Sequence, residues 1–404
     1  MRAAEHGDRA ALLQAVSIGN RRGSLSNREA TAIAREVAER ELRTSPPVEA
    51  LSRVREARAC AYELDDPLAD RMRTHDATGA EAALARIEGR GLSPGGARVF
   101  AADPDAAWHA VGARGLVRAE DRVNRLRALL DPDPRVRRQA ARAAHDAASE
   151  GDLDALVEAA RLDPEPIVRT EAVRAIVALP PAPRTAIILR DLWNGGDDGL
   201  REDIARAWSA PSLWSAGGRE ALRVLLAAEH GPGALEGAAA VLRRREADAD
   251  MAQVAAALLM RTIQSGSRRE RLQALAQTPL DRSELLASVK TAAGDGDAEV
   301  RVAALARLAP GDSARVRELE ALAQPGSRVA ASARFALAGL GDRRVQAWIE
   351  QDLASSVPED RLGAATALAA MGVAARAAAL LADADSSVRL RAACTLLMAA
   401  RASR

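Results

Sequence analysis

Arginine residues recur at regular intervals in the first half of the sequence, and they are the residues best placed to do chemistry. Four of them fall on one face of successive predicted helices, namely Arg138, Arg142, Arg174 and Arg206. A guanidinium group binds a carboxylate or a phosphate through two parallel hydrogen bonds, so this stripe suits an acidic or phosphate-bearing partner. Pairing within each helix is the competing interpretation, because Glu171 precedes Arg174 by three residues and Glu202 precedes Arg206 by four.

Other residues that carry enzyme chemistry are sparse and have the wrong spacing for it. The His residues form no His-x-x-x-His pair, and the two Cys, Cys60 and Cys394, lie at opposite ends of the chain. We therefore assign no catalytic, metal-binding or cofactor-binding residue, and the sequence predicts a protein that is not an enzyme. The two Cys suggest no disulfide framework, and they slightly favour a reduced compartment.

A motif that recurs roughly every 30 residues sets the elements that position the arginines. It consists of an Asp-rich turn, an apolar residue followed by Arg, and then Ala three positions after the Arg. The clearest copies span residues 131–140, 163–172, 295–304 and 383–392. Such a period is typical of stacked helical repeats, in which each unit buries its apolar face only against its neighbours.

The residue before the motif Arg provides an anchor for aligning the repeats. The anchors are Trp108, Val136, Val168, Leu200, Leu235, Glu270, Val300, Val329, Asp360 and Val388. Arg follows most of them, and a small or branched apolar residue such as Ala140 comes four positions after each. Small side chains in one column allow helices of adjacent repeats to approach closely.

These columns resemble the HEAT repeat in its short bacterial form, over about residues 94 to 400. The resemblance implies two antiparallel helices per repeat, with ladders of Asp and Arg between repeats. We therefore expect an all-α, right-handed α-solenoid of about ten two-helix repeats over residues 94–404. HEAT arrays act mostly as scaffolds, so the resemblance implies a protein-binding role and no cofactor.

Residues 1–93 do not follow the repeat columns, and we expect them to form a helical cap over the first repeat. Apolar residues three or four apart predict helices over residues 9–16, 27–43, 48–64 and 80–88. Ser26 or Asn27 can cap the second of these helices.

Function must depend on positions that the packing columns leave free. In the late repeats these positions are apolar and predict a groove for an amphipathic helix, with Leu272, Val302, Phe335, Leu362 and Leu390 as candidates. The competing interpretation is that they are ordinary core residues. Trp214, in a loop inserted between repeats, is a candidate contact hot spot unless it folds back over a repeat edge.

The last repeat ends the array without a polar cap, so we expect its helix, with Leu390, Cys394 and Leu397, to form a dimer contact or the weakest part of the solenoid. The favoured partner is a protein that presents an acidic segment or an amphipathic helix. A nucleic-acid-binding groove like that of HEAT-like DNA glycosylases is the alternative, although the net charge of +1 weighs against it. A phycobilin-lyase-like enzyme is a third possibility, disfavoured by the scarcity of aromatic residues.

No apolar run approaches the length of a membrane span. We expect a cytoplasmic protein by default, or a cell-envelope protein if a signal segment or lipid anchor has been removed ahead of Met1.

Overall fold

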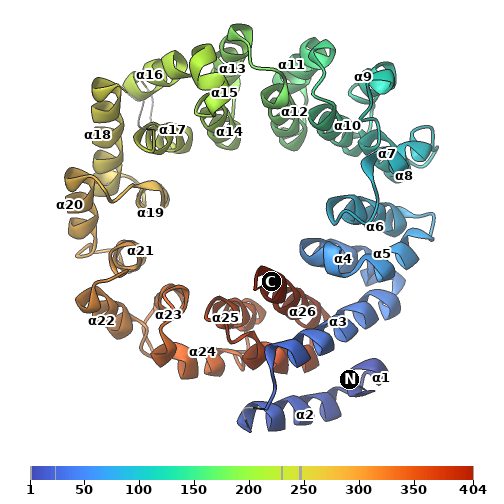
Figure 1. The fold of residues 1–404 in the computed structure, drawn as a ribbon, viewed down its shortest axis with the longest axis vertical. Helices are drawn as coiled ribbons and strands as arrows, with labels where there is room; N and C mark the ends of the chain where they lie inside the picture. Colours follow the sequence, from blue (N-terminus) through green and yellow to red (C-terminus); the bar gives the residue numbers. More distant parts are fainter. Residues whose placement is uncertain (1, 23, 229–230, 245–247, 404) are drawn as a thin grey trace. The chain divides into compact units, whose positions relative to one another are not determined.

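The computed structural model of the chain describes residues 2–22, 24–228, 231–244 and 248–403. Every regular element within these ranges is a helix, which confirms the expected all-α class (Figure 1). By its contacts the chain divides into two compact units: unit 1 comprises Met1–Ser93 and Ala309–Arg404, and unit 2 comprises Pro94–Leu308. The repeat pattern predicted a division after residue 93, and the contacts add a second one after Leu308. None of the described helices is both long and apolar enough to cross a membrane.

Unit 2 is a stack of helix pairs in which the second helix of each pair packs on the second helix of the next, in the order α8, α10, α12, α14, α17, α19 and α21. Its helices are α7 (Pro94–Ala97), η2 (Arg98–Phe100), α8 (Ala106–Arg114), η3 (Ala119–Asp121), α9 (Arg122–Ala128), α10 (Pro134–Ala147), η4 (Glu150–Asp152), α11 (Leu153–Leu162), α12 (Pro166–Ala178), α13 (Pro183–Gly195), α14 (Asp198–Trp208), α15 (Pro211–Leu213), η5 (Trp214–Gly218), α16 (Arg219–Ala228), α17 (Pro232–Leu242), α18 (Ala249–Ser265), α19 (Arg268–Gln277), α20 (Ser283–Ala292) and α21 (Ala298–Leu308).

Unit 1 is built from both ends of the chain. From the N-terminal end come α1 (Arg2–His6), α2 (Arg9–Arg21), α3 (Asn27–Thr44), α4 (Pro47–Ala57), η1 (Arg58–Glu63), α5 (Asp65–Met72) and α6 (Ala77–Glu88). From the C-terminal end come α22 (Ser313–Leu322), α23 (Ala330–Gly339), η6 (Arg343–Val345), α24 (Gln346–Asp352), α25 (Pro358–Ala370), η7 (Ala374–Ala382) and α26 (Ser386–Ala402). The predicted N-terminal helices are present, and the sequence missed only the short α1 and α5.

The anchors mark the second helix of each repeat. Most of these helices begin two residues before their anchor, as α10 does before Val136. Asp133 caps α10 by accepting a hydrogen bond from the amide of Arg135 at 2.8 Å, and Pro134 takes the first helical position, where no amide hydrogen is needed. There are two exceptions: α17 begins three residues before its anchor Leu235, and α23 begins one residue after its anchor Val329 and has no side-chain cap.

Four motif arginines each join their own turn to a second segment: Arg137, Arg169, Arg361 and Arg389. Arg137 donates from Nη1 to the carbonyl oxygen of Asp131 in its own turn at 2.9 Å, and from Nε to the carboxylate of Asp163 in the next repeat at 2.7 Å. In unit 1 the same contact joins Arg361 to Asp383 at 2.8 Å. The ladder of Asp and Arg implied by the HEAT resemblance is therefore present.

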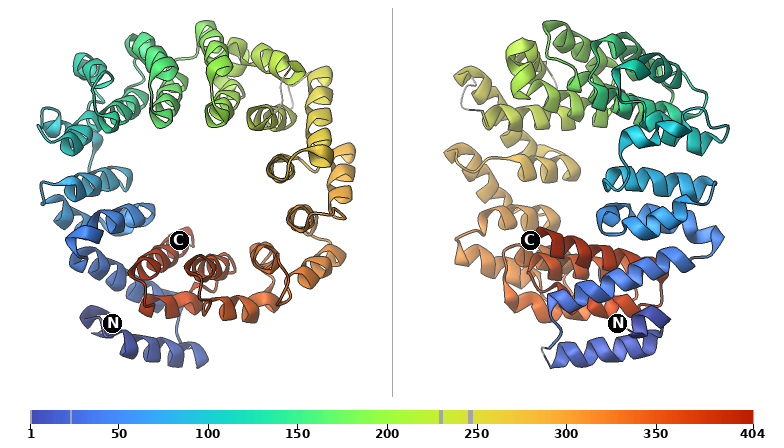
Figure 2. Two further views of the ribbon diagram at one scale, coloured as in Figure 1. Left: turned by 180° about the vertical axis from the view of Figure 1, so that it is seen from behind. Right: turned by 45° about the vertical axis from the view of Figure 1, so that its right-hand side comes forward.

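The N-terminal helices cover the last repeat, so the expectation of an uncovered end was wrong. In Figures 1 and 2, α3 lies along α26, and α4 and η1 also contact α26. Glu41 of α3 accepts a hydrogen bond from Arg389 at 2.7 Å, in the role that the Asp of a following repeat plays elsewhere. Leu390, Cys394 and Leu397 are all buried within the chain, which removes the physical reason for a dimer contact there.

Polar contacts hold the other end of α3 in place. Ser26 caps the helix by accepting a hydrogen bond from the amide of Glu29 at 3.2 Å. Asn27 does not cap α3: its amide group donates to the carbonyl of Gly372 and accepts from the amide of Ala375, both at 3.0 Å. The N-terminal segment is thereby fixed to the turn between α25 and η7.

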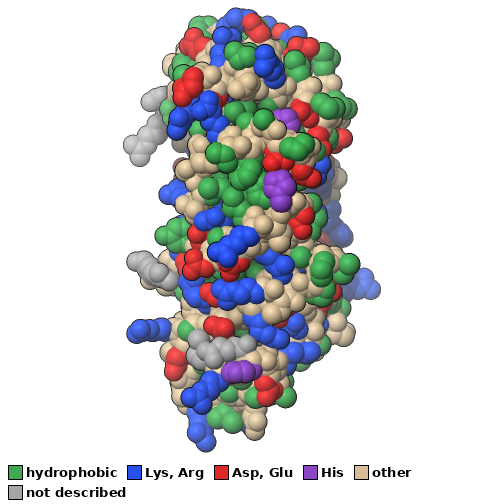
Figure 3. All heavy atoms as spheres, turned by 90° about the vertical axis from the view of Figure 1, so that its right-hand side faces the viewer, with side chains coloured by type: hydrophobic (Ala, Val, Ile, Leu, Met, Phe, Trp, Pro, Cys, Tyr) green, Lys and Arg blue, Asp and Glu red, His purple; other side chains and the backbone are tan. Residues whose placement is uncertain are grey.

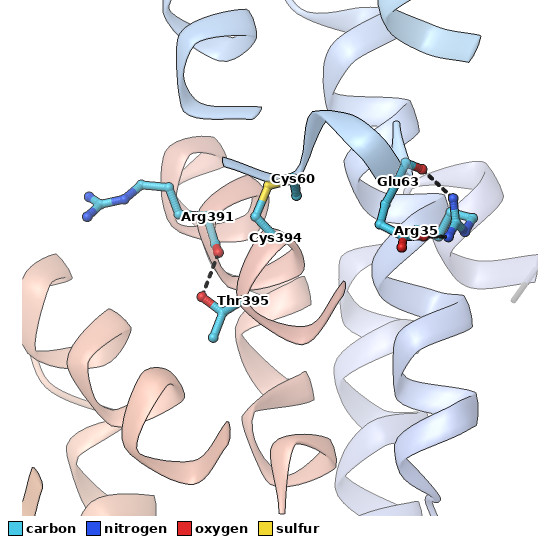
Figure 4. The surroundings of a disulfide bond; sticks show 6 residues. All are labelled: Arg35, Cys60, Glu63, Arg391, Cys394 and Thr395. Atoms are coloured by element: carbon cyan, nitrogen blue, oxygen red, sulfur yellow. Dashed lines mark hydrogen bonds and ion pairs between the residues drawn. A yellow bond between two sulfur atoms is a disulfide. The ribbon is translucent and has the colours of Figure 1, made fainter. Parts of the chain in front are cut away.

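A disulfide bond joins Cys60 of η1 to Cys394 of α26 (Figure 4). The expectation of no disulfide was therefore wrong: the two residues pair although 334 positions separate them and neither lies in a recognisable cysteine motif. Their Cα atoms are 5.3 Å apart, a separation that a disulfide requires. The bond links the first segment of unit 1 covalently to its last helix.

Removing this bond should destabilise unit 1 without undocking it. A disulfide that closes a long loop restricts the unfolded chain and contributes about 2–4 kcal/mol, while the contacts of Glu41 and Asn27 with the C-terminal segment remain. We expect Cys394→Ala to lower the midpoint of thermal unfolding, and reductant to lower it for the wild type but not for the variant. An unchanged wild-type midpoint, under conditions in which mass spectrometry detects two free thiols, would contradict this prediction.

Candidate protein-binding groove

The predicted arginine stripe is present in unit 2, and acidic residues of neighbouring repeats neutralise it. Glu171 of α12 lies 3.6 Å from Arg138, 3.7 Å from Arg142 and 3.8 Å from Arg174. Arg174 also pairs with Asp203 of α14 at 3.2 Å. The charges therefore bridge α10, α12 and α14 as well as pairing within one helix.

The same pattern continues to α17. Arg206 pairs with Asp203 at 2.8 Å and with Glu236 at 3.5 Å, whereas the predicted partner Glu202 accepts a hydrogen bond from Gln273 at 3.3 Å. The three shared acids are largely buried, while the guanidinium groups reach solvent. The stripe is therefore mainly a device that joins repeats, and its positive charge is largely compensated.

Removing one of these acids should test this role. Glu171→Gln leaves Arg138, Arg142 and Arg174 without their shared anion, and because all three reach water we expect a loss of about 1 kcal/mol in the free energy of unfolding. The exposed Glu158, on the neighbouring α11, provides a matched control as Glu158→Gln. The measurement is the urea unfolding midpoint, and equal midpoints for the two variants would refute the role.

Most of the predicted apolar stripe belongs to the core. Val302, Leu362 and Leu390 are buried, and Leu272 is half-buried. Only Phe335 is exposed, with 51% of its surface open to solvent. It lies six positions after its anchor, in the column that holds Arg142, Arg174 and Arg206 in unit 2, and like these arginines it reaches solvent.

Trp214 is not the exposed contact residue that the sequence suggested. Only 7% of its surface is accessible, because the inserted loop closes into the short helices α15 and η5. The guanidinium group of Arg244 lies 4.6 Å from the centre of the indole ring, a distance that allows a cation–π interaction. Trp214 therefore stabilises the edge of its repeat, as the competing interpretation held.

Phe335 lies in a groove between α23 and α25 of unit 1. The groove has a volume of about 720 Å³, and small residues form much of its lining, including Ala331, Ser332, Gly363 and Ala367. α23 and α25 pack against each other beside it. An exposed aromatic ring in an otherwise small-residue groove is the kind of apolar surface that binds protein partners.

The repeat motif is irregular on both sides of the groove. Ala330 stands where most repeats have the ladder Arg, and Ser355 stands where the clearest copies of the motif have the Asp that accepts from it. The ladder contact is therefore missing between α23 and α25, and it resumes with Arg361 and Asp383. The late start of α23 removes a further helical turn from the same place.

Gly363 is the most informative residue of the lining. It lies in the middle of α25, where Gly costs about 1 kcal/mol relative to Ala. A Cβ atom added there would meet nothing within 4 Å, so packing inside the chain does not require Gly. The corresponding position is Gln139, Glu171 and Asp203 on α10, α12 and α14, and Ala238, Gln273 and Ala303 on α17, α19 and α21.

The charged groups around the groove are not all satisfied. Arg334 pairs with Asp352 at 2.6 Å, and Arg391 donates to Glu359 at 2.8 and 3.1 Å, which lowers the pKa of Glu359. Among the described residues, the exposed Arg328 has no hydrogen bond or ion pair. The groove therefore offers one uncompensated guanidinium group beside an apolar surface.

Within the part of the chain that the structure describes, the side chains do not assemble a metal site. Over the described ranges, no cluster of three or more His, Cys, Asp or Glu side chains could hold a metal ion. On the face drawn in Figure 3, acidic and basic side chains are interleaved, with no broad surface of one sign. The sequence analysis identified Phe335 but not Gly363 or Arg328. The signal that could have pointed to them is the pair of irregular motif positions, Ala330 and Ser355.

Comparison with known proteins supports the repeat assignment. A family model for HEAT repeats matches residues 98–177 and 125–209. A structure of the karyopherin Kap121p bound to the extreme C-terminus of the protein phosphatase Cdc14p is 14% identical, with a TM-score of 0.28, over 90% of this chain and 49% of that chain. UNC-45 from Drosophila melanogaster is 12% identical, with a TM-score of 0.27, over 94% and 72%. The chain thus spans about half the length of the karyopherin structure, and a search of curated proteins gave no match.

Proposed function

We propose, from the premise that residues 98–209 are HEAT repeats and that the described helices continue them as a solenoid, that this protein is a non-enzymatic scaffold for a protein partner. The observation that carries the proposal is the groove around Phe335. The ring of Phe335 is half exposed inside this groove, and aromatic residues at the centre of an apolar surface are frequent hot spots of protein interfaces.

Two features support a protein partner over a nucleic acid. The arginines that would contact phosphates, Arg142, Arg174 and Arg206, already face Glu171, Asp203 and Glu236. A nucleic acid would have to compete with these anions for every contact, while the groove around Phe335 presents one free cation only. The same pairing weakens the case for an acidic segment that lies along the stripe.

Replacing the aromatic ring by a charge should remove the interaction. Phe335→Asp places a carboxylate at the centre of the groove, and we expect at least a tenfold loss in recovery of the partner. The measurement is quantitative mass spectrometry after affinity capture from an extract of the producing organism. Val48→Asp, at another highly exposed position of unit 1, is the control and should capture the same proteins as the wild type. Identical sets of proteins on all three baits would refute the groove as the binding site.

The disulfide adds a proposal about where the scaffold works. Disulfides persist in oxidising compartments and are rare in the cytosol, so the Cys60–Cys394 bond favours the cell envelope or the exterior over the default cytoplasmic location. We expect the protein, isolated from cells quenched with an alkylating reagent, to carry no alkyl group on Cys60 or Cys394. Alkylation of both residues without prior reduction would contradict this location.

A further inference from the structure

The last repeat shows which kind of segment can cover the face of unit 1 on which the groove lies. Cys394 lies six positions after its anchor, in the same column as Phe335, and this position is covered by η1. α4 also contacts α26. On the last repeat, then, helical segments from a distant part of the sequence occupy the face that the groove exposes two repeats earlier.

We propose that the groove between α23 and α25 takes a single helix of a partner protein, which approaches the backbone of α25 closely at Gly363. This inference rests on the proposed scaffold function and names the form of its partner. The partner helix would place a small residue against Gly363, an apolar side chain against Phe335 and a carboxylate against Arg328.

Gly363 carries the argument for close approach. No neighbouring atom of the chain requires Gly there, and the backbone of α25 is helical at this position, so the missing side chain leaves open space. Ala367, one helical turn later on the same face, also lines the groove. Gly363 is exposed and Ala367 is buried, so it is the open backbone at Gly363 that allows another helix to lie at short distance, as the Ala columns do between the repeats of this chain.

Charge complementarity fixes one end of the partner. Arg328 precedes α23, and its guanidinium group has no partner among the residues that the structure describes. The acidic residues nearby are engaged: Asp352 with Arg334, Glu359 with Arg391, and Asp360 with the hydroxyl of Ser355 at 2.9 Å. A carboxylate on the partner helix is therefore the group that this end of the groove lacks.

The experiment uses the full chain and a displayed library of amphipathic helices as the probe. One library position on the apolar face varies in size from Gly to Leu, and one position at the end of the helix varies among Glu, Gln and Lys. Selection on the wild-type chain should enrich small residues at the first position and Glu at the second. The selected helix, made as a labelled peptide, is then titrated by fluorescence anisotropy with the wild type and its variants.

Filling the open space should prevent binding. We expect Gly363→Leu to weaken the peptide at least tenfold while the midpoint of thermal unfolding stays at or above that of the wild type, because the new side chain meets no atom of the chain. Gly363→Ala should raise the unfolding midpoint and weaken binding less.

Arg328→Gln should weaken binding of the peptide a few-fold and reduce the dependence of that binding on salt. Ala370→Leu adds the same bulk at an exposed position of α25 outside the groove and should leave binding unchanged.

The outcomes separate this inference from the proposed function. Enrichment of Leu at the first position, or wild-type affinity for Gly363→Leu, would overturn the close helical approach. An absence of any enriched helix, alongside a partner whose capture depends on Phe335, would also overturn it and leave the scaffold function standing. Selected helices that bind Phe335→Asp as well as the wild type would overturn both.

Discussion

A helix pair of this chain can bury its apolar face only against the next pair, and the rest of the structure follows from that constraint. The motif Arg holds each turn to the next, as Arg137 holds the turn at Asp131 to Asp163. An array built in this way has an open apolar face at its end. Unit 1 resolves the problem with its own N-terminal helices: α3 supplies Glu41 to Arg389, and the helices that follow cover Leu390 and Leu397.

Repeat positions that lie outside the core can carry different residues in different repeats, and the differences change how neighbouring helices contact each other. On α10, α12 and α14 the outward-facing column carries arginines, and the position three residues after the anchor supplies the acids Glu171 and Asp203 that bind them. In the repeat that contains α23 the outward column carries Phe335, and the facing position on α25 is Gly363. At this place an aromatic ring and an empty space stand where α10, α12 and α14 have charge pairs between neighbouring helices.

The sequence was sufficient for the parts of the fold that depend on neighbours in the chain. The anchors located the second helices because capping, helix periodicity and the contact of Arg with the following turn all act within about one repeat. It could not show that Cys60 meets Cys394, or that residues 27–44 cover the last helix, because no local pattern connects positions more than 300 residues apart. The prediction that Trp214 is an exposed contact residue was wrong for a related reason. Its burial depends on the path of an inserted loop and on Arg244, which comes from the following repeat.

The candidate site was only partly predictable from the sequence. A regular column predicts the contact that its residue makes in each repeat, whereas a residue that departs from the column can be interpreted in two ways. Ala330 and Ser355 could have marked a degenerate repeat that packs poorly, or a repeat whose ladder contact has been given up for another purpose. Burial decides between these meanings. Ala333, Leu337 and Leu368 remain buried around the gap, so the helices of these repeats pack as well as the others do. The loss is confined to the ladder, to the first turn of α23 and to the missing side chain of Gly363, and these three irregularities meet in one groove. The core is kept while one surface is changed, and this is the arrangement on which the proposed binding groove rests.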